Sequence, residues 1–275
     1  SVGVAVYSVT RPGALEGVAY YLTPDFSRFS PMTVLAAMGQ MFYSMSLAMG
    51  IMVTYGSYMK KEDDLEKSVK QIELFDTGMA FVAGLMIIPA VFAFSGGDEA
   101  ALNKGAGLMF VTLPKVFADA GTLGLVFGGL FFLLVLFAAL TSSVSLMETV
   151  VSIFQDKFHW SRKKTCGLVL VGCLILAAPS SLGYGTLSWI APLGLSILDF
   201  FDFITNSVMM PIVAFCTCVF VGYVVGTKVV VNEVKRSSPF KREKLFVVVV
   251  KYVAPVCIVL ILVSSILDTL GVIKI

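Results

Sequence analysis

Small and hydroxyl-bearing side chains interrupt an apolar stretch at residues 38–59, and this interruption has the chemistry of a binding site. Ser44, Ser46, Ala48 and Gly50 fall near the middle of the stretch. A helix that faces only lipid would carry plain Leu and Val there, because every backbone group in hydrocarbon must be paired within the protein. Transporters bind substrates and coupling ions at broken helices near the bilayer midplane. The pattern therefore predicts a function as well as a membrane span.

A second run of hydroxyl groups occurs at residues 138–145, Ala-Ala-Leu-Thr-Ser-Ser-Val-Ser. Such hydroxyls often bond back to carbonyls of their own helix or pack against a neighbouring helix. Alternatively, they supply oxygen ligands to a hard cation. The interruption at 44–50 favours the cation, since two interruptions at similar depth could line one cavity. Both interpretations stay open from these residues alone.

Four acidic residues lie in or beside apolar stretches, where charged groups are candidates for function. Asp76 is either an acid at the start of a helix, favoured by the helix dipole, or a functional group. Glu148 is either a polar packing residue or a functional one. Asp199 and Asp202 precede an apolar stretch, where solvated acids are the simpler interpretation.

Enzyme chemistry is not expected from this sequence. It has no nucleotide-binding loop, no metal-ligand cluster and no pairing of a nucleophile with a base. His159 is the single histidine and lies in a basic loop. The five cysteines lie within apolar stretches without the paired spacing of a zinc site, so we interpret them as packing residues.

The elements that must position these residues are membrane-spanning helices. The sequence is 57% hydrophobic and 14% charged, whereas soluble domains carry about 25% charged residues. Each of six apolar stretches exceeds the roughly 20 residues that a helix needs to cross a bilayer. We therefore predict an all-α, polytopic transmembrane helical bundle. The stretches are residues 31–59, 73–95, 122–155, 164–183, 186–226 and 246–270.

Basic residues predict the orientation of the bundle. Most of the 20 Lys and Arg residues lie in three alternate connections, at 60–70, 157–164 and 228–251. Loops rich in Lys and Arg stay in the cytoplasm. We therefore predict a multi-pass membrane protein with an external C-terminus; a bacterial inner membrane as its location is implied only by the family resemblance described below. This distribution serves topology, so no nucleic-acid partner is expected; the lipid bilayer is the expected surrounding.

Residues 1–275 are interpreted as the C-terminal portion of one transporter domain. Residues 1–30 are expected to hold the end of a truncated span and an external, turn-rich loop, and residues 31–275 to hold six complete spans. The long connection Phe94–Thr122 contains apolar pieces, which favour a lid that packs into the bundle. In the stretch at 186–226, the first part, Leu187–Ile197, is expected to be a turn or short helix before the span.

Several motifs resemble the neurotransmitter:sodium symporter family, and most closely its bacterial branch that carries hydrophobic amino acids. Residues 39–50, GQMFYSMSLAMG, followed by TYGSY at 54–58, are similar to the sixth span of that family. LTSS at 140–143 resembles its eighth span, FVTLP at 110–114 its fourth external loop, and DFFD at 199–202 its tenth span. The resemblance implies a partial inverted-repeat transporter fold, from the end of span five to span eleven.

The resemblance also implies roles for single residues. It assigns sodium ions as the coupled cargo, with Ser44, Asp76, Ala138 (through its carbonyl), Thr141 and Ser142 as ligands. It assigns substrate contacts to Tyr43, Ser46, Met49, Ser142 and Leu146. It assigns gating to Tyr58 and Asp156 at the cytoplasmic end and to Asp202 at the external end.

Asp76 departs from the pattern of the chloride-dependent members of the family, which have Asn at this place. A carboxylate brings its own negative charge beside the cation, so chloride is not expected to be required. Met49 stands where an aromatic residue is common, and a flexible thioether makes a softer pocket. The expected function is sodium-coupled symport of a neutral, hydrophobic or aromatic amino acid. The alternative is a non-transporting membrane scaffold or receptor that keeps the fold, for which the oxygen ligands would have no use. A channel is disfavoured, because the sequence has no carbonyl filter motif and no ring of charges.

Overall fold

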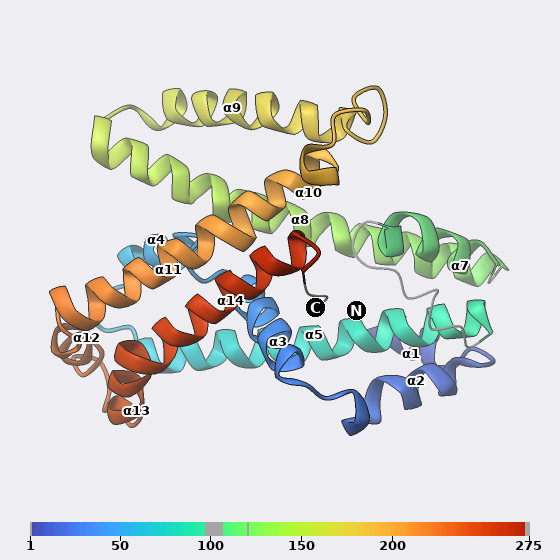
Figure 1. Cartoon of the computed structure of the whole chain (residues 1–275), viewed down its shortest axis with the longest axis horizontal. Helices are drawn as coiled ribbons and strands as arrows, with labels where there is room; N and C mark the ends of the chain where they lie inside the picture. Colours follow the sequence, from blue (N-terminus) through green and yellow to red (C-terminus); the bar gives the residue numbers. More distant parts are fainter. Residues whose placement is uncertain (1, 97–106, 120, 273–275) are drawn as a thin grey trace. The chain divides into compact units, whose positions relative to one another are not determined.

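A computed structural model describes residues 2–96, 107–119 and 121–272. The described residues form helices and turns and contain no strand, which confirms the predicted all-α class (Figure 1). Contacts divide the chain into two units. Unit 1 comprises Ser1–Phe29 and Ile72–Ser143, and unit 2 comprises Ser30–Gln71 and Val144–Ile275. The predicted site residues are divided between these units.

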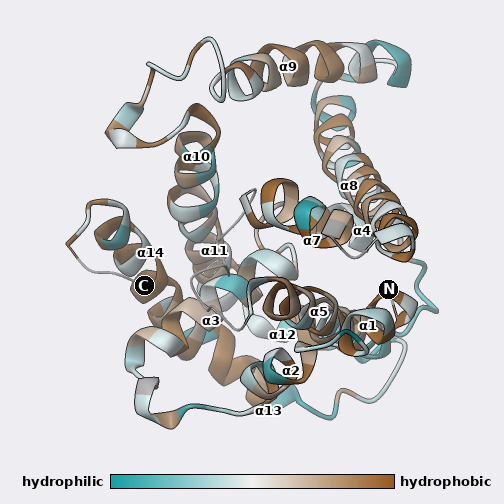
Figure 2. Ribbon diagram, turned by 90° about the vertical axis from the view of Figure 1, so that its right-hand side faces the viewer, coloured by the Kyte–Doolittle hydropathy of each residue, from teal (hydrophilic) through white to brown (hydrophobic). Residues whose placement is uncertain are grey.

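Five helices among the described residues are long and apolar enough to cross a membrane: α5 (Leu65–Ser95), α8 (Gly121–Phe158), α9 (Arg162–Leu182), Ile197–Val224 and Glu243–Thr269. The remaining predicted span, at residues 31–59, corresponds to two helices, α3 (Pro31–Ser44) and α4 (Ile51–Tyr58), with a break between them. Apolar residues cover α8 and α9 along most of their length, and hydrophilic residues mark the start of α9 (Figure 2). Few residues of α9 are buried within the protein, so its apolar surface requires a nonaqueous surrounding such as lipid.

Ile197–Val224 and Glu243–Thr269 each combine α-helical and π-helical pieces. The first is made of α10 (Ile197–Asp202), η5 (Phe203–Met209), α11 (Met210–Val219) and η6 (Phe220–Val224). The second is made of α13 (Glu243–Val248), η7 (Val249–Val253) and α14 (Ala254–Thr269). Turns and a short 3₁₀ helix, η4 (Pro192–Gly194), fill most of the region before Ile197, as expected. The helix α12 (Thr227–Val234) follows the first of these two spans.

In unit 1, residues 2–9 form α1 (Val2–Val9), and a second helix replaces part of the turn-rich loop expected within residues 1–30. This helix, α2 (Ala14–Leu22), packs closely on α5. A Cβ added at Gly17 would lie 2.8 Å from the Pro89 Cα atom, and one added at Gly84 would lie 2.2 Å from the Tyr21 ring. The expectation of a loop throughout this region is wrong, because two glycines make room for α2 to pack on α5, and this contact pattern is not visible in a hydropathy profile.

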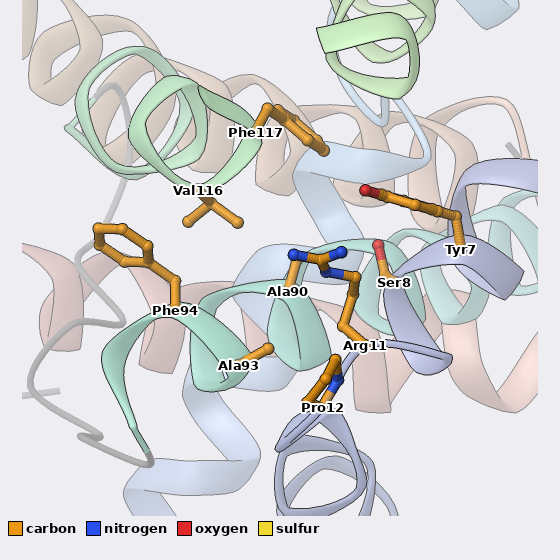
Figure 3. A pocket seen from close by; sticks show the side chains of 9 residues that line it. All are labelled: Tyr7, Ser8, Arg11, Pro12, Ala90, Ala93, Phe94, Val116 and Phe117. Carbon is orange, nitrogen blue, oxygen red and sulfur yellow. The ribbon is translucent and has the colours of Figure 1, made fainter. Parts of the chain in front are cut away.

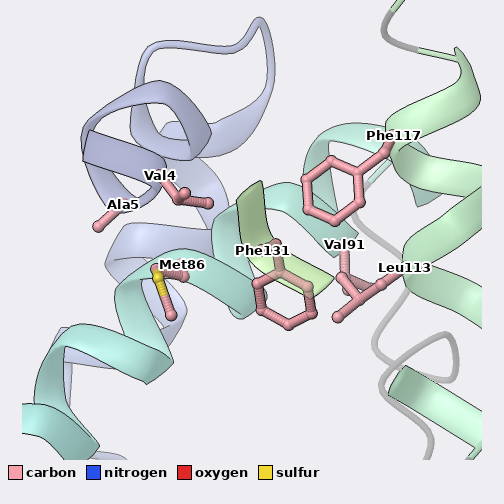
Figure 4. Packing of buried hydrophobic residues seen from close by; sticks show 7 residues of the cluster. All are labelled: Val4, Ala5, Met86, Val91, Leu113, Phe117 and Phe131. Carbon is pink, nitrogen blue, oxygen red and sulfur yellow. The ribbon is translucent and has the colours of Figure 1, made fainter. Parts of the chain in front are cut away.

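The connection after α5 contributes to the core of unit 1. Residues 97–106 and 120 of this connection lie outside the described residues. The described part forms the π-helical turn η3 (Leu108–Thr112) and the helix α7 (Leu113–Asp119). Leu113 and Phe117 are buried in one cluster with Val91 of α5 and Phe131 of α8 (Figure 4). The expected packing of this apolar connection against the bundle is therefore confirmed within unit 1.

In unit 2, α11 and α14 lie side by side, and α3 packs against α14 (Figure 1). A buried cluster joins Phe42 of α3 to Met210, Ala214 and Ile258 of these two helices. The start of α3 is well defined, because Ser30 and Thr33 form a reciprocal capping box and Pro31 occupies the first turn.

The helix α5 begins at Leu65, eight residues before the apolar stretch at 73–95 that predicted it. Asp64 caps this start, since the backbone N–H of Lys67 donates to Asp64 Oδ1 at 2.9 Å. The Ser238 hydroxyl donates to the same oxygen at 2.8 Å. These two donors, the Lys67 amide first, hold the pKa of Asp64 below its usual range. Polar residues thus continue the helix beyond its apolar part, which a search for apolar stretches cannot detect.

Candidate functional site

The predicted interruption of the sixth span is confirmed as a break between α3 and α4. Residues 45–50 leave the helical path, and three of them take left-handed backbone angles: φ is +54° at Ser46, +62° at Ala48 and +80° at Gly50. Glycine accepts such angles freely, whereas other residues are destabilised by about 1–2 kcal/mol each. Non-glycine residues keep this conformation only where the surrounding structure imposes it, and such sites cluster at ligand-binding positions.

Packing within unit 2 imposes this conformation on the broken segment. Phe42, at the end of α3, is buried against α11 and α14. Leu47, Ala48 and Met49 pack on the same cluster. The break is therefore anchored from both sides by apolar contacts and not left as a free loop. The i to i−4 hydrogen-bond pattern of α3 ends with the Met45 N–H, and the pattern of α4 begins where the Thr54 N–H donates to the Gly50 carbonyl. Backbone groups between these two points are therefore candidates for binding a ligand.

The helix α4 is held against the second half of α8 by close contacts. A Cβ added at Gly50 would lie 2.9 Å from the Thr149 Cγ2 atom, so the backbone and this side chain are in tight contact. Thr149 is buried, and its hydroxyl donates to the Ser145 carbonyl at 3.0 Å. One turn further along α4, the Tyr55 and Ser145 hydroxyls share a hydrogen bond of 2.6 Å.

Glu148 of α8 is the centre of a polar network beside the C-terminal end of α4. The Tyr58 hydroxyl donates to Glu148 Oε1 at 2.8 Å. Arg162, at the start of α9, donates to both carboxylate oxygens, at 3.1 and 2.5 Å. The Glu148 side chain is 18% exposed and that of Arg162 is 61% exposed. This paired geometry is the strong form of an ion pair, and it ties α4, α8 and α9 together.

This network places Glu148 and Arg162 beside the predicted gating residue Tyr58. Tyr58 was predicted to act with Asp156, but its hydroxyl bonds to Glu148. Asp156 is exposed and lies eight residues further along α8, about 12 Å at the rise of an α-helix. Its role stays a prediction. The signal for Glu148 was present in the sequence as an acid inside an apolar stretch, but its partner Arg162 could not be identified without the turn between α8 and α9.

In unit 1, two of the predicted sodium ligands on α8, Ala138 and Thr141, have oxygens within hydrogen-bonding distance of each other. The Thr141 hydroxyl donates to the Ala138 carbonyl at 2.9 Å and to the Phe137 carbonyl at 3.1 Å. The back-bonding alternative is thus what the structure contains. It does not compete with the cation interpretation, because the hydroxyl keeps its lone pairs and can donate to Phe137 while the Ala138 carbonyl binds elsewhere.

Asp76 lies well inside α5 and not at its start. It is partly buried and stands 11 residues after Leu65, which is about 16 Å along the helix. The dipole acts within the first turn, where Glu66 is the acid. The interpretation of Asp76 as an acid at a helix start is therefore wrong, because the helix begins earlier than the apolar stretch.

The remaining predicted residues are placed as follows. Tyr43 and Ser44 end α3, and Leu146 and Ser142 lie on α8, where both are exposed. Asp202 ends α10, and its carboxylate accepts a hydrogen bond from the Asn206 side chain. Of the sodium and substrate residues, unit 2 holds Tyr43, Ser44, Ser46, Met49 and Leu146, and unit 1 holds Asp76, Ala138, Thr141 and Ser142.

The chain matches a model of the sodium:neurotransmitter symporter family across residues 2–272. It belongs to this family. An uncharacterized sodium-dependent transporter of Haemophilus influenzae is 34% identical over 96% of the chain and 57% of its own length. The human sodium- and chloride-dependent creatine transporter 1 is 26% identical over 80% of the chain and 35% of its own length. The family membership confirms the predicted resemblance.

A solved structure of the same fold is that of MhsT in complex with L-phenylalanine. It superposes with a TM-score of 0.84 at 38% identity, over 96% of the chain and 59% of MhsT. The predicted fold class is confirmed, and the chain is part of a multi-pass membrane protein of a sodium-dependent transporter family. The chain spans about half the length of the curated relatives it matches.

Proposed function

We propose that the protein containing this chain couples the movement of sodium ions to the uptake of a neutral hydrophobic or aromatic amino acid. The observation that carries this proposal is the break between α3 and α4, with left-handed backbone at Ser46 and Ala48. A strained, well-packed interruption inside an apolar span has no evident use in a purely structural helix. Membership in a family of sodium-dependent transporters supports the coupling ion.

The substrate pocket is assigned to Tyr43, Ser46 and Met49 of the broken span, with Ser142 and Leu146 of α8. Tyr43, Met49 and Leu146 provide apolar surface, and the thioether of Met49 adapts to differently shaped side chains. Backbone groups at the break between α3 and α4 would bind polar groups of a substrate. MhsT, which is 38% identical, was crystallised with L-phenylalanine, and this supports an amino acid of that class.

Sodium ions are assigned to oxygen ligands on α3, α5 and α8. Ala138, Thr141 and Ser142 would hold one ion, and Ser44 with Asp76 would hold another. Thr141 Oγ1 and the Ala138 carbonyl oxygen are 2.9 Å apart, so both can approach one hard cation. Asp76 supplies a negative charge, which is the reason to propose transport without chloride. Uptake that stops in chloride-free buffer would refute this part of the proposal.

Alternating access requires that the two ends of the pathway open in turn. We assign the cytoplasmic closure to Tyr58 and Asp156, and we add Glu148 and Arg162 to it. We assign the external closure to Asp202. The bond from Tyr58 to Glu148 and the paired bonds from Arg162 support the cytoplasmic assignment. The positive-inside distribution of Lys and Arg supports the orientation, in the inner membrane of a bacterium with an external C-terminus.

The proposal is tested by uptake of radiolabelled L-phenylalanine into proteoliposomes that contain the whole protein. Uptake should require an inward sodium gradient and should fall when potassium replaces sodium. Thr141→Val removes one proposed ligand and should raise the sodium concentration needed for half-maximal uptake by about tenfold, the loss expected for one hydrogen-bonding ligand.

Thr217→Val is the matched control for this experiment. Its hydroxyl donates to the Val213 carbonyl at 2.8 Å, in the same back-bonded manner as Thr141, but it lies in a span without proposed ligands. It should leave the sodium dependence unchanged. Equal uptake in sodium and potassium, or sodium-dependent binding without any uptake, would contradict the transport function and favour a receptor or scaffold.

A further inference from the structure

A cavity of about 160 Å³ lies within unit 1, where the end of α1 meets the end of α5 and the helix α7 (Figure 3). None of the residues proposed for sodium, substrate or gating lines it. An engineered cavity of about 150 Å³ is large enough to bind benzene. The cavity in unit 1 can therefore accept a small organic molecule, and its lining determines which kind.

Two buried hydroxyl groups at this cavity lack hydrogen-bond partners. Ser8 is 1% exposed, and both its hydroxyl and that of Tyr7 are buried without a partner. The Tyr7 ring is fixed by stacking on Phe127, with centroids 4.0 Å apart. Figure 3 shows both hydroxyls directed towards the space that Arg11 enters. Buried polar groups are almost always paired in native proteins, so these two are positioned for a partner that is absent from the chain itself.

Arg11 adds a positive charge to the same end of the cavity. Its backbone N–H donates to the Ser8 carbonyl at 3.4 Å in the turn that ends α1, and both side chains line the cavity. Gly13, with φ of +81°, reverses the chain directly afterwards, and the Arg11 guanidinium lies 5.7 Å from the centre of the Tyr7 ring. No carboxylate among the described residues pairs with Arg11. Three donors and no acidic side chain are thus gathered at one end.

The opposite part of the cavity is apolar. Ala90, Ala93 and Phe94 of α5 and Val116 and Phe117 of α7 line it. An inorganic anion would leave this surface without a contact, whereas an organic acid would use both ends. A free amino acid would bring an ammonium group, and no carboxylate lines the cavity to accept it.

We propose that this cavity binds a small monocarboxylate with an apolar body. Arg11 pairs with the carboxylate, as guanidinium groups do in the strongest charge-assisted bonds. The Ser8 and Tyr7 hydroxyls donate to the same carboxylate, and the apolar body lies against Phe94, Val116 and Phe117. The site is separate from the proposed transport site and does not depend on that assignment.

Equilibrium dialysis of radiolabelled benzoate against the whole protein, purified in lipid nanodiscs, tests this proposal. Benzoate should bind saturably to one site per chain, and benzylamine of the same size should not compete. Saturating L-phenylalanine with sodium should leave benzoate binding unchanged, and chloride at equal concentration should not displace it. The assignment would be overturned if chloride, benzylamine or L-phenylalanine displaced benzoate. It would also be overturned if benzoate showed no saturable binding, as expected for a cavity that holds only water.

Variants distinguish a binding role from a structural one. Arg11→Gln should weaken benzoate binding by at least tenfold, and Ser8→Ala by roughly three- to tenfold. Ser8→Ala should not lower the melting temperature of the ligand-free protein, because it removes a buried hydroxyl that has no partner. Arg242→Gln, an exposed arginine outside the cavity, should change nothing. If Arg11→Gln does not fold, unchanged benzoate affinity in Ser8→Ala suffices to reject the proposal.

Discussion

Gly50 is the position at which the broken span is most sensitive to a single methyl group. It precedes α4 with φ of +80°, and an added Cβ would lie 2.9 Å from Thr149 Cγ2. In Gly50→Ala the left-handed backbone should cost about 1–2 kcal/mol. The methyl–methyl contact is well inside the optimal separation of about 3.5–4.0 Å, and overpacking of this kind costs about 1–3 kcal/mol. We therefore expect a total destabilisation of about 2–5 kcal/mol.

Gly56→Ala is the matched control for this substitution. Gly56 lies inside α4 with open space around its Cα, so no atom lies within 4 Å of an added Cβ. Alanine in a helix interior should stabilise the protein by about 0.5–1 kcal/mol relative to glycine. The two substitutions make the same chemical change six residues apart, and the structure predicts opposite signs for them.

Thr149→Ser separates the two contributions at Gly50. Serine keeps the hydroxyl that donates to the Ser145 carbonyl and removes the crowded methyl group. In the double variant the backbone contribution should remain and the overpacking contribution should vanish, so the coupling energy should be about 1–3 kcal/mol. Unfolding of the purified protein in mixed micelles measures these energies, and sodium-dependent phenylalanine binding reports on the site. A coupling energy near zero, or a Gly50→Ala protein as stable as the parent, would refute this account.

Three other predictions concern charged groups. Glu148→Gln should open the predicted cytoplasmic closure and raise the labelling rate of a Ser46→Cys reporter several-fold. Glu233→Gln, which breaks an exposed ion pair with Arg236 at the end of α12, should not. The lowered pKa of Asp64 means that its stabilising effect is present above about pH 4 and is lost as the pH falls through the still lower pKa of the folded state. The melting temperatures of the parent and of Asp64→Asn should thus differ at neutral pH and converge in acid; a constant difference would contradict this. Asp76→Asn should make uptake depend on added chloride, and unchanged uptake in chloride-free buffer would disprove the charge-replacement argument.

Helix boundaries were the part of the fold for which the sequence was least sufficient. The apolar stretch at 73–95 predicted a span, but α5 starts at Leu65, where Asp64 caps it. Hydropathy reports the part of a helix in lipid and not the polar turns that extend it into water. This difference changed the interpretation of Asp76, which moved from the start of a helix to its interior. Hydropathy also gave no sign of the helix α2, since its contact with α5 depends on close approach at two glycines, of the α5 backbone at Gly17 and of the Tyr21 ring at Gly84.

The sequence by itself determined the membrane class and the place where one apolar stretch breaks. These properties depend on local composition: long apolar runs require lipid, and a cluster of Ser, Ala and Gly in such a run destabilises a continuous helix. The motifs at 39–58 and 140–143 likewise carried the family resemblance without any coordinates.

Only the tertiary structure decided which side chains meet. The left-handed angles at Ser46 and Ala48 exist because the break is packed on α11 and α14, and the partners of Glu148 come from α4 and α9. Tyr7, Ser8 and Arg11 line one cavity together with residues of α7 that lie about 100 positions later in the sequence. Residues that far apart carry no local signal of their pairing, because their contact depends on how whole helices pack, and no single segment contains that information.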